Sequence, residues 1–121
     1  MSFVFDHFNY HVTDMDRSVA FYEKTLRMKV IREMGSSDGP VRFVMLGYDD
    51  QKVVLELKWE KAHEGGYDIG DGSYHFCVKT DEFEKALALY EEMGIIVFRM
   101  GDHMCFIKDP DGYQIEVMKL S

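Results

Sequence analysis

An internal repeat is the feature that most constrains what this chain can fold into. A shift of 68 residues sets residues 7–23 on residues 75–91, so that His7 falls on His75, and the match runs without a gap. A shared pattern of this length predicts that both stretches adopt the same local structure. The chain is therefore interpreted as two copies of one unit.

The ends of the two copies match under a smaller shift. Sixty residues separate Glu56 from Glu116, and both glutamates sit among apolar residues. The second copy is therefore shorter by eight residues, and the extra length of the first falls in the turn-forming segment 35–40. We expect one domain of 121 residues, built from two repeats at about 1–60 and 70–121.

Each copy has the pattern of one strand, one helix and three further strands. Alternating polar and apolar residues predict a first strand near 7–12 in one copy and near 75–78 in the other. Helical spacing of apolar residues follows, and the polar pairs at 13–14 and 80–81 suit the start of a helix, as Gly94 suits the end of the second. The further strands are expected at 29–34, 41–46 and 53–58, and at 97–100, 104–108 and 113–118. The prediction is an α+β fold of two tandem βαβββ modules.

The charge of the chain excludes some classes of partner. Fourteen basic and 22 acidic residues give a net charge of −8, and the basic residues are scattered. Nucleic acid and anionic membranes attract clustered basic residues, and a membrane span needs about 20 consecutive apolar residues. We expect no nucleic acid and no membrane as partners. Because Cys77 and Cys105 lie in apolar segments without motif spacing, we expect reduced core thiols and a cytoplasmic location.

The repeat also places the same chemical groups at equivalent positions. His7 matches His75 at the head of the first strand, and Glu56 matches Glu116 on the last strand. A single histidine or glutamate at such positions is more often structural or solvated, but here both residue types recur in both copies. A carboxylate within an apolar strand is costly unless it is paired or bound to a metal. Two imidazoles and two carboxylates suit Ni²⁺, Co²⁺, Zn²⁺ or Mn²⁺, so the pattern predicts one shared metal site.

The remaining histidines fit other roles. His11 shares the face of His7 but lies about 13 Å farther along a strand, so we expect it to line the cavity rather than to bind the same metal. His63 stands in a charged, glycine-rich stretch and is expected to be solvated. His103 lies in a loop or at a strand edge, where it is a candidate for facing the substrate.

Six segments of the sequence carry a likeness to a known family. They are residues 14–22, 26–30, 43–48, 55–57, 67–70 and 109–116. Through them the chain resembles glyoxalase I (lactoylglutathione lyase) of the vicinal oxygen chelate superfamily over nearly its full length. The helix motif and the Asp-Pro-Asp-Gly turn are shared across that superfamily, whereas the order His, Glu, His, Glu is more discriminating.

The resemblance implies a homodimer whose curved mixed sheets surround a metal held by His7, Glu56, His75 and Glu116. It implies one divalent metal per site, with Ni or Co preferred and Zn possible. The implied reaction is methylglyoxal detoxification, in which the hemithioacetal of methylglyoxal and a small thiol becomes a lactoyl thioester through a cis-enediolate. Glu116, and Glu56 for the opposite face, are the implied catalytic residues that transfer the proton.

Some residues differ from the family pattern at positions that concern the thiol part of the substrate. Members that use glutathione usually have Arg where His11 stands and Asn where Glu60 stands, and a longer basic loop where this chain has residues 99–103. Glutathione is anionic, and a further carboxylate near its cleft would repel it. We therefore expect His11, Glu60 and His103 to line the substrate site, and a different small thiol, one with a cationic portion, is a hypothesis.

Two other functions compete with this interpretation, because the fold alone does not decide among chemistries. One is a non-catalytic small-molecule binding protein like the bleomycin-resistance proteins, which generally lack the full ligand set. The other is a different metal-dependent enzyme of the superfamily, such as an epimerase.

Overall fold

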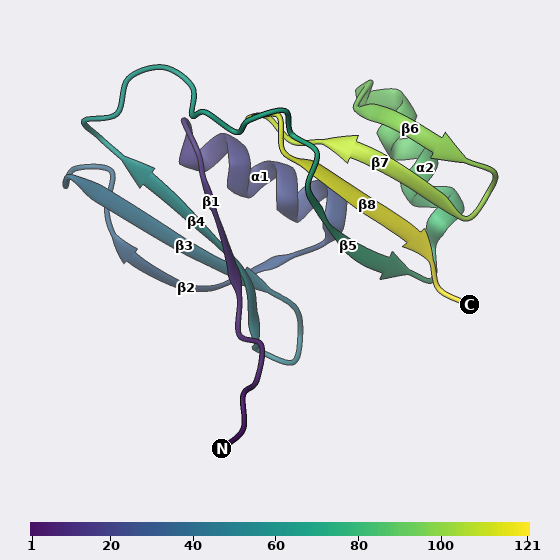
Figure 1. Cartoon of the computed structure of the whole chain (residues 1–121), viewed down its shortest axis with the longest axis horizontal. Coiled ribbons are helices and arrows are strands. Elements are labelled where there is room, and N and C mark those ends of the chain that lie inside the picture. The colour runs from purple at the N-terminus through teal and green to yellow at the C-terminus, as the bar shows by residue number, and fades with distance from the viewer. The chain divides into compact units, whose positions relative to one another are not determined.

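The computed structural model describes all 121 residues of the chain. It contains two compact units, Met1–Tyr67 and Asp68–Ser121. Each unit is one four-stranded mixed sheet with one helix, as Figure 1 shows unit by unit. The predicted α+β fold of two tandem βαβββ modules is confirmed.

The first unit holds five elements. They are β1 (Phe8–His11), α1 (Met15–Leu26), β2 (Lys29–Gly35), β3 (Val41–Gly47) and β4 (Val53–Glu60). The strand order is β1-β4-β3-β2, and β1 runs parallel to β4 while the other neighbours are antiparallel. The first and last strands of the module are therefore neighbours.

The second unit repeats this arrangement. Its elements are β5 (His75–Thr80), α2 (Phe83–Met93), β6 (Ile96–Met100), β7 (Met104–Lys108) and β8 (Gln114–Lys119). The order is β5-β8-β7-β6, with β5 parallel to β8. Each strand lies where the repeat predicts it, to within two residues at either end.

One face of each sheet forms a core with its helix. In the first unit Leu55 and Leu57 are fully buried on β4, which contacts α1, and Tyr22 of α1 is buried with them. In the second unit Ile115 and Val117 of β8 are buried, and β8 contacts α2. Burial of each such side chain contributes about 1.5–3 kcal/mol. Since side chains alternate along a strand, the residues between these point to the opposite face of the sheet.

The two helices begin differently. Asp14 is the N-cap of α1, and its Oδ1 accepts a hydrogen bond of 3.1 Å from the Arg17 backbone N–H, as the sequence predicts. The pair at 80–81, which the sequence predicts at the start of the second helix, directly precedes the N-cap Glu82, and Glu82 makes no side-chain capping bond. The Oγ1 of Thr80 instead accepts the Glu82 N–H at 3.0 Å. Asp81 lies outside the helix.

Both helices end in a left-handed residue. Gly94 takes φ +69°, which confirms its predicted role, and Arg27 takes φ +58° at the equivalent point of α1. A residue with a side chain pays about 1–2 kcal/mol for this conformation. The Tyr48 hydroxyl donates to the Leu26 carbonyl oxygen at 3.0 Å and holds this helix end, and burial raises the pKa of Tyr48 to about 12.

The turn before β8 is fixed by one buried carboxylate. Asp109 is 5% exposed, and its Oδ1 accepts the backbone N–H groups of Asp111 and Tyr113, both at 2.9 Å. Gly112 takes φ +93°, a conformation that favours glycine. This turn sets where β8 starts and therefore where Glu116 falls on it.

The two cysteines have different environments. Cys105 is buried, as predicted, and burial raises the pKa of its thiol to about 11. Cys77 is exposed, so its prediction as a core residue is wrong. It lies on β5, the terminal strand of its sheet, and points to the face opposite the helix because its neighbours in sequence alternate with it. No helix of the structure is long and apolar enough to cross a membrane.

Candidate functional site

A parallel strand pair brings one histidine and one glutamate together in each unit. His7 precedes β1 and Glu56 lies on the adjacent β4, and their Nε2 and Oε2 atoms are 3.8 Å apart. His75 begins β5 and Glu116 lies on the adjacent β8, with Nε2 and Oε1 3.3 Å apart. The four residues singled out in the sequence therefore form two pairs, one within each unit.

The two pairs are buried to nearly the same degree. The glutamate side chains are 19% and 18% exposed, and the histidine side chains are 36% and 38% exposed. Each pair lies on the sheet face that does not pack on the helix, and each glutamate is flanked along its strand by buried aliphatic residues. A carboxylate in such surroundings is stabilised by a nearby cation. In each pair, one imidazole nitrogen and one carboxylate oxygen lie close to each other.

Further polar side chains support the first pair. The Nδ1 of His7 is hydrogen-bonded to the Asp6 carboxylate, and the Asn9 amide donates to Glu56 Oε1 at 3.0 Å. A neutral imidazole that donates Nδ1–H leaves the lone pair of Nε2 available to a metal. In this structure the Nε2 atom of His7 faces the Glu56 carboxylate.

The second pair has other neighbours. Tyr74 stands before His75 where Asp6 stands before His7, and the ring of Phe106 packs edge-on against His75 at 4.6 Å between centroids. Cys77 is the cross-strand partner of Glu116. Burial, and then the negative charge of Glu116, raise the pKa of the Cys77 thiol, which keeps it protonated at neutral pH. Matching of the two copies missed Asn9 and Cys77, because the copies have different residues at this position, two residues after each histidine.

His11 belongs to an aromatic cluster in the first unit. The centroid of its ring lies 5.1 Å from that of Tyr67. The ring of His63 stacks on the same Tyr67 ring, with 3.7 Å between centroids and an interplanar angle of 4°. His63 is exposed, as expected, and its Nε2 lies 3.2 Å from the Gly66 carbonyl oxygen.

Glu60 ends β4 and forms an ion pair with Lys58, with 2.9 Å between Oε1 and Nζ. The hydrogen bond and charge of Lys58 lower the pKa of Glu60, and His11 and His63 lower it further. The carboxylate is therefore ionised at neutral pH, but a cation on the same strand offsets its charge.

His103 lies in the turn between β6 and β7 of the second unit. Its side chain is 56% exposed, and its Nδ1 lies 3.9 Å from Asp102. The His103 carbonyl oxygen accepts the Lys119 N–H at 2.8 Å, which fixes the backbone while the ring remains exposed.

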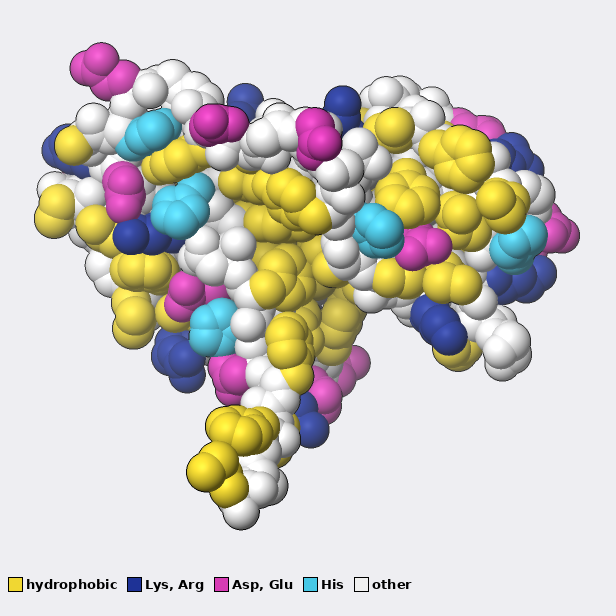
Figure 2. Space-filling model, viewed as in Figure 1, with side chains coloured by type: hydrophobic (Ala, Val, Ile, Leu, Met, Phe, Trp, Pro, Cys, Tyr) yellow, Lys and Arg dark blue, Asp and Glu magenta, His cyan; other side chains and the backbone are white.

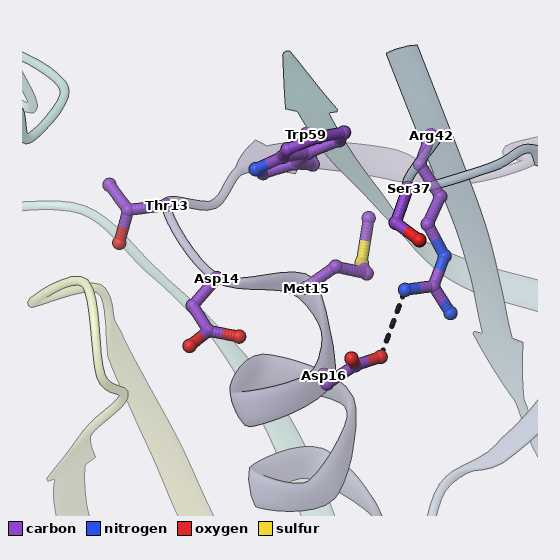
Figure 3. A pocket seen from close by; sticks show the side chains of 7 residues that line it. All are labelled: Thr13, Asp14, Met15, Asp16, Ser37, Arg42 and Trp59. Atoms are coloured by element: carbon purple, nitrogen blue, oxygen red, sulfur yellow. Dashed lines mark hydrogen bonds and ion pairs between the residues drawn. The ribbon is translucent and has the colours of Figure 1, made fainter. Parts of the chain in front are cut away.

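A cavity that the sequence did not indicate lies at the far end of β1 from His7. It has a volume of about 200 Å³ and is lined by Thr13, Asp14, Met15, Asp16, Ser37, Arg42 and Trp59 (Figure 3). Arg42 donates to Asp16 at 2.9 Å and to Glu33 at 3.0 Å, and these bonds raise the pKa of Arg42. Within the cavity Arg42 and Asp16 therefore neutralise each other, while Asp14 accepts the Arg17 backbone N–H.

A group of three or more His, Cys, Asp or Glu side chains that could hold a metal ion is not found in this structure. Each His–Glu pair therefore lacks a third such side chain in its own unit. A single pair supplies two donor atoms, whereas stable sites for transition metals usually use three or four protein ligands. Neither pair alone therefore provides the full ligand set of such a site.

Comparison with known proteins agrees with this architecture. Residues 4–117 match the Glyoxalase/Bleomycin resistance protein/Dioxygenase superfamily. A lactoylglutathione lyase of Neisseria meningitidis is 30% identical over 119 residues, which cover 89% of this chain and 84% of that protein. The solved structure of the trypanothione-dependent glyoxalase I of Leishmania major is 29% identical with a TM-score of 0.86, and the match covers 98% of this chain and 87% of that one.

The chain therefore belongs to the glyoxalase/bleomycin resistance/dioxygenase superfamily, and within it to the lactoylglutathione lyase (glyoxalase I) family. A probable chloroplastic lactoylglutathione lyase of Arabidopsis thaliana is 34% identical over 122 residues, which cover 93% of this chain. The chain spans only 35% of the length of that plant relative. The resemblance inferred from the sequence motifs is confirmed.

Proposed function

We propose that this chain is a metal-dependent lyase that converts the hemithioacetal of methylglyoxal and a small thiol into a lactoyl thioester, and so detoxifies methylglyoxal. The observation that carries the proposal is the His–Glu pair built at the equivalent position of both modules. The relatives named lactoylglutathione lyase support it. Both cysteines are free thiols, which supports a cytoplasmic location.

The proposed metal ligands are His7, Glu56, His75 and Glu116. Two imidazole nitrogens and two carboxylates, without a thiolate, suit a borderline ion with positions left for oxygen ligands, so Ni²⁺ or Co²⁺ is preferred and Zn²⁺ is possible. The Asp6 hydrogen bond, which leaves Nε2 of His7 free to coordinate, fits this role. When bound, the metal would supply Lewis acidity that makes the carbon-bound proton of the substrate easier to remove.

The proton transfer is assigned to the glutamates. Glu116 takes the proton from the carbon that carries sulfur and returns it to the neighbouring carbon, and Glu56 serves the opposite face of the substrate. The aldehyde-derived carbon becomes the thioester carbonyl and the former ketone carbon gains the hydrogen, so no external oxidant is needed. Such acid–base catalysis contributes roughly 10²–10⁴-fold.

The proposed thiol is one that carries less negative charge than glutathione. His11, Glu60 and His103 are proposed to line its site. Glu60 is ionised and its charge is only locally offset by Lys58, while the chain as a whole carries −8. This field disfavours anionic substrates. The Leishmania major relative, which depends on trypanothione, is a precedent for a thiol other than glutathione.

The proposed assembly is a homodimer with metal sites shared between chains. Met1, Phe3, Val4 and Phe5 are each at least 78% exposed and immediately precede Asp6 and the ligand His7. Figure 2 shows this apolar segment projecting from the surface near the N-terminus. A second copy of the chain that covered these side chains would lie next to His7.

Protein purified without chelator is expected to contain about one transition metal ion per chain, because the four ligands form one site. Chelation should abolish turnover of the hemithioacetals, and Ni²⁺ or Co²⁺ should restore more activity than Zn²⁺. Elemental analysis and reconstitution assays check this. Protein without metal that gains no activity on metal addition would contradict the proposal and favour a non-catalytic binding function.

The thiol preference is tested with a matched substrate pair. The methylglyoxal adduct of glutathione monoethyl ester, which lacks one negative charge, should have a kcat/KM about tenfold higher than that of glutathione. Trypanothione serves as a further probe. E60Q should narrow the difference between the glutathione adducts, because it removes the carboxylate and keeps the side-chain shape. Equal kcat/KM values for both adducts would refute the charge argument.

Glu116 and His75 should respond differently to substitution. E116Q removes the proton acceptor but keeps an oxygen ligand, so kcat should fall roughly 10²-fold or more while Ni²⁺ affinity falls less than in H75A. Calorimetric titration of the metal-free variants gives the affinities. If both variants lose metal equally and E116Q retains kcat once saturated with Ni²⁺, Glu116 is only a ligand.

Sharing of the site between chains predicts complementation. H7A and H75A alone should be inactive, whereas refolding them together at equal amounts should restore about a quarter of wild-type activity, because mixed dimers have one intact site. Sedimentation analysis confirms that dimers form. Mixtures that contain dimers but stay inactive would show that each site lies within one chain.

A further inference from the structure

The two His–Glu pairs are alike in burial and in their place in the sheet, but they differ in the residue that faces each glutamate. Their glutamates are 19% and 18% exposed, their histidines 36% and 38%, and both glutamates lie on the last strand of a module beside its first strand. Neither the exposed fraction of the side chain nor its strand position in the sheet therefore distinguishes Glu56 from Glu116. The difference lies in the residue directly across the strand pair from each glutamate.

That residue is Asn9 for Glu56 and Cys77 for Glu116. Both stand two residues after the histidine, and the shift of 68 residues that relates the modules sets one on the other. The repeat therefore provides one position from which a side chain can hold the glutamate, and the two modules fill it with different donors.

Asn9 is a strong donor for this purpose. Its Nδ2 lies 3.0 Å from Glu56 Oε1, and the other oxygen, Oε2, faces His7. A hydrogen bond to a charged carboxylate is stronger than one between neutral groups. Both oxygens of Glu56 thus have a fixed neighbour, and this glutamate is held in place.

Cys77 is a poor donor. A thiol has a single, weakly donated proton. In this structure the Sγ of Cys77 lies 3.6 Å from the Val78 carbonyl oxygen, and the thiol also forms a hydrogen bond with Glu116, which contributes to the raised pKa of Cys77. The donor beside Glu116 is therefore a thiol shared between two acceptors, which is weaker than the Asn9 amide beside Glu56.

We infer that Asn9 and Cys77 are positioning residues that divide the work of the two glutamates, Asn9 fixing Glu56 as a static ligand and Cys77, the weaker donor, holding Glu116 less firmly. The inference rests on the proposed function, in which a glutamate carries a proton between adjacent carbons. A carboxylate that does so must reorient, and a strong hydrogen bond opposes this reorientation. The asymmetry favours Glu116 as the principal base.

The first test measures the two contacts without metal or substrate. Double-mutant cycles on the metal-free full chain compare N9A with E56Q, and C77A with E116Q, by urea unfolding. The Asn9–Glu56 coupling should change the unfolding equilibrium constant by about threefold to tenfold, and the Cys77–Glu116 coupling by less than about twofold. Equal couplings in the two cycles would overturn the inference.

The second test transfers the donor. C77N places an amide beside Glu116, so kcat should fall about fivefold or more while KM stays within about twofold. The isotope effect with methylglyoxal deuterated at the aldehyde carbon should rise, because proton transfer becomes slower. K79N, which adds the same amide two residues farther along the same face of β5, is the matched control and should keep wild-type kcat. An unchanged kcat in C77N, or equal losses in C77N and K79N, would overturn the inference.

The two tests separate this inference from the proposed function. If the wild-type chain with Ni²⁺ turned over no hemithioacetal, the proposed function would fail, while the unfolding cycles would still show whether Asn9 holds Glu56 more firmly than Cys77 holds Glu116. If the wild type is active and the cycles or C77N give the opposing results, only the inference fails.

Discussion

The parallel pairing of the first and last strands of each module is the constraint on which the rest of the structure depends. In each module the helix carries the chain to the opposite edge of the sheet, and three antiparallel strands then bring it back, so that β1 lies beside β4 and β5 lies beside β8. Residues far apart in sequence, such as His7 and Glu56, thereby reach the same face of one sheet. If the first strand ran antiparallel to the last strand of its module, the start of the first strand would lie beside the end of the last strand. The histidine and the glutamate would then not form a pair.

The helix face and the open face of each sheet serve different purposes. The buried residues that alternate with Glu56 and Glu116 fix the strands against the helix. Because the strand period is two, a slip of one residue would move the glutamate into the core. The apolar packing that stabilises each module therefore also determines that its carboxylate faces away from the helix, where a cation or a substrate can reach it.

Much of this arrangement could be predicted from the sequence because the repeat presents each signal twice. The order of the elements along the chain follows from the duplicated βαβββ pattern, and His7 with Glu56 were singled out because His75 and Glu116 repeat them. Positions at which the copies differ carry no such signal. Asn9 was missed for that reason, since its contact with Glu56 depends on the strand register rather than on residue identity.

Two local features differ from what the sequence indicates, for physical reasons. Cys77 lies in an apolar segment, which predicted a buried side chain. Because side chains alternate along the strand, the Cys77 side chain instead points away from the helix and is exposed. Asp81 has the chemistry of a helix cap, yet α2 starts after Glu82, and the hydroxyl of Thr80 takes the free N–H instead. In both cases the composition of the segment indicated the kind of element. The role of the residue was decided by which way its side chain points, or by the residue at which the element begins.

The ends of the two helices show what duplication retained. Gly94 and Arg27 have nearly the same left-handed backbone, although only one of them is glycine. The two modules therefore follow the same chain path at this turn with different residues. What the repeat shares at the end of each helix is the backbone conformation, and the identity of the residue that adopts it is not shared.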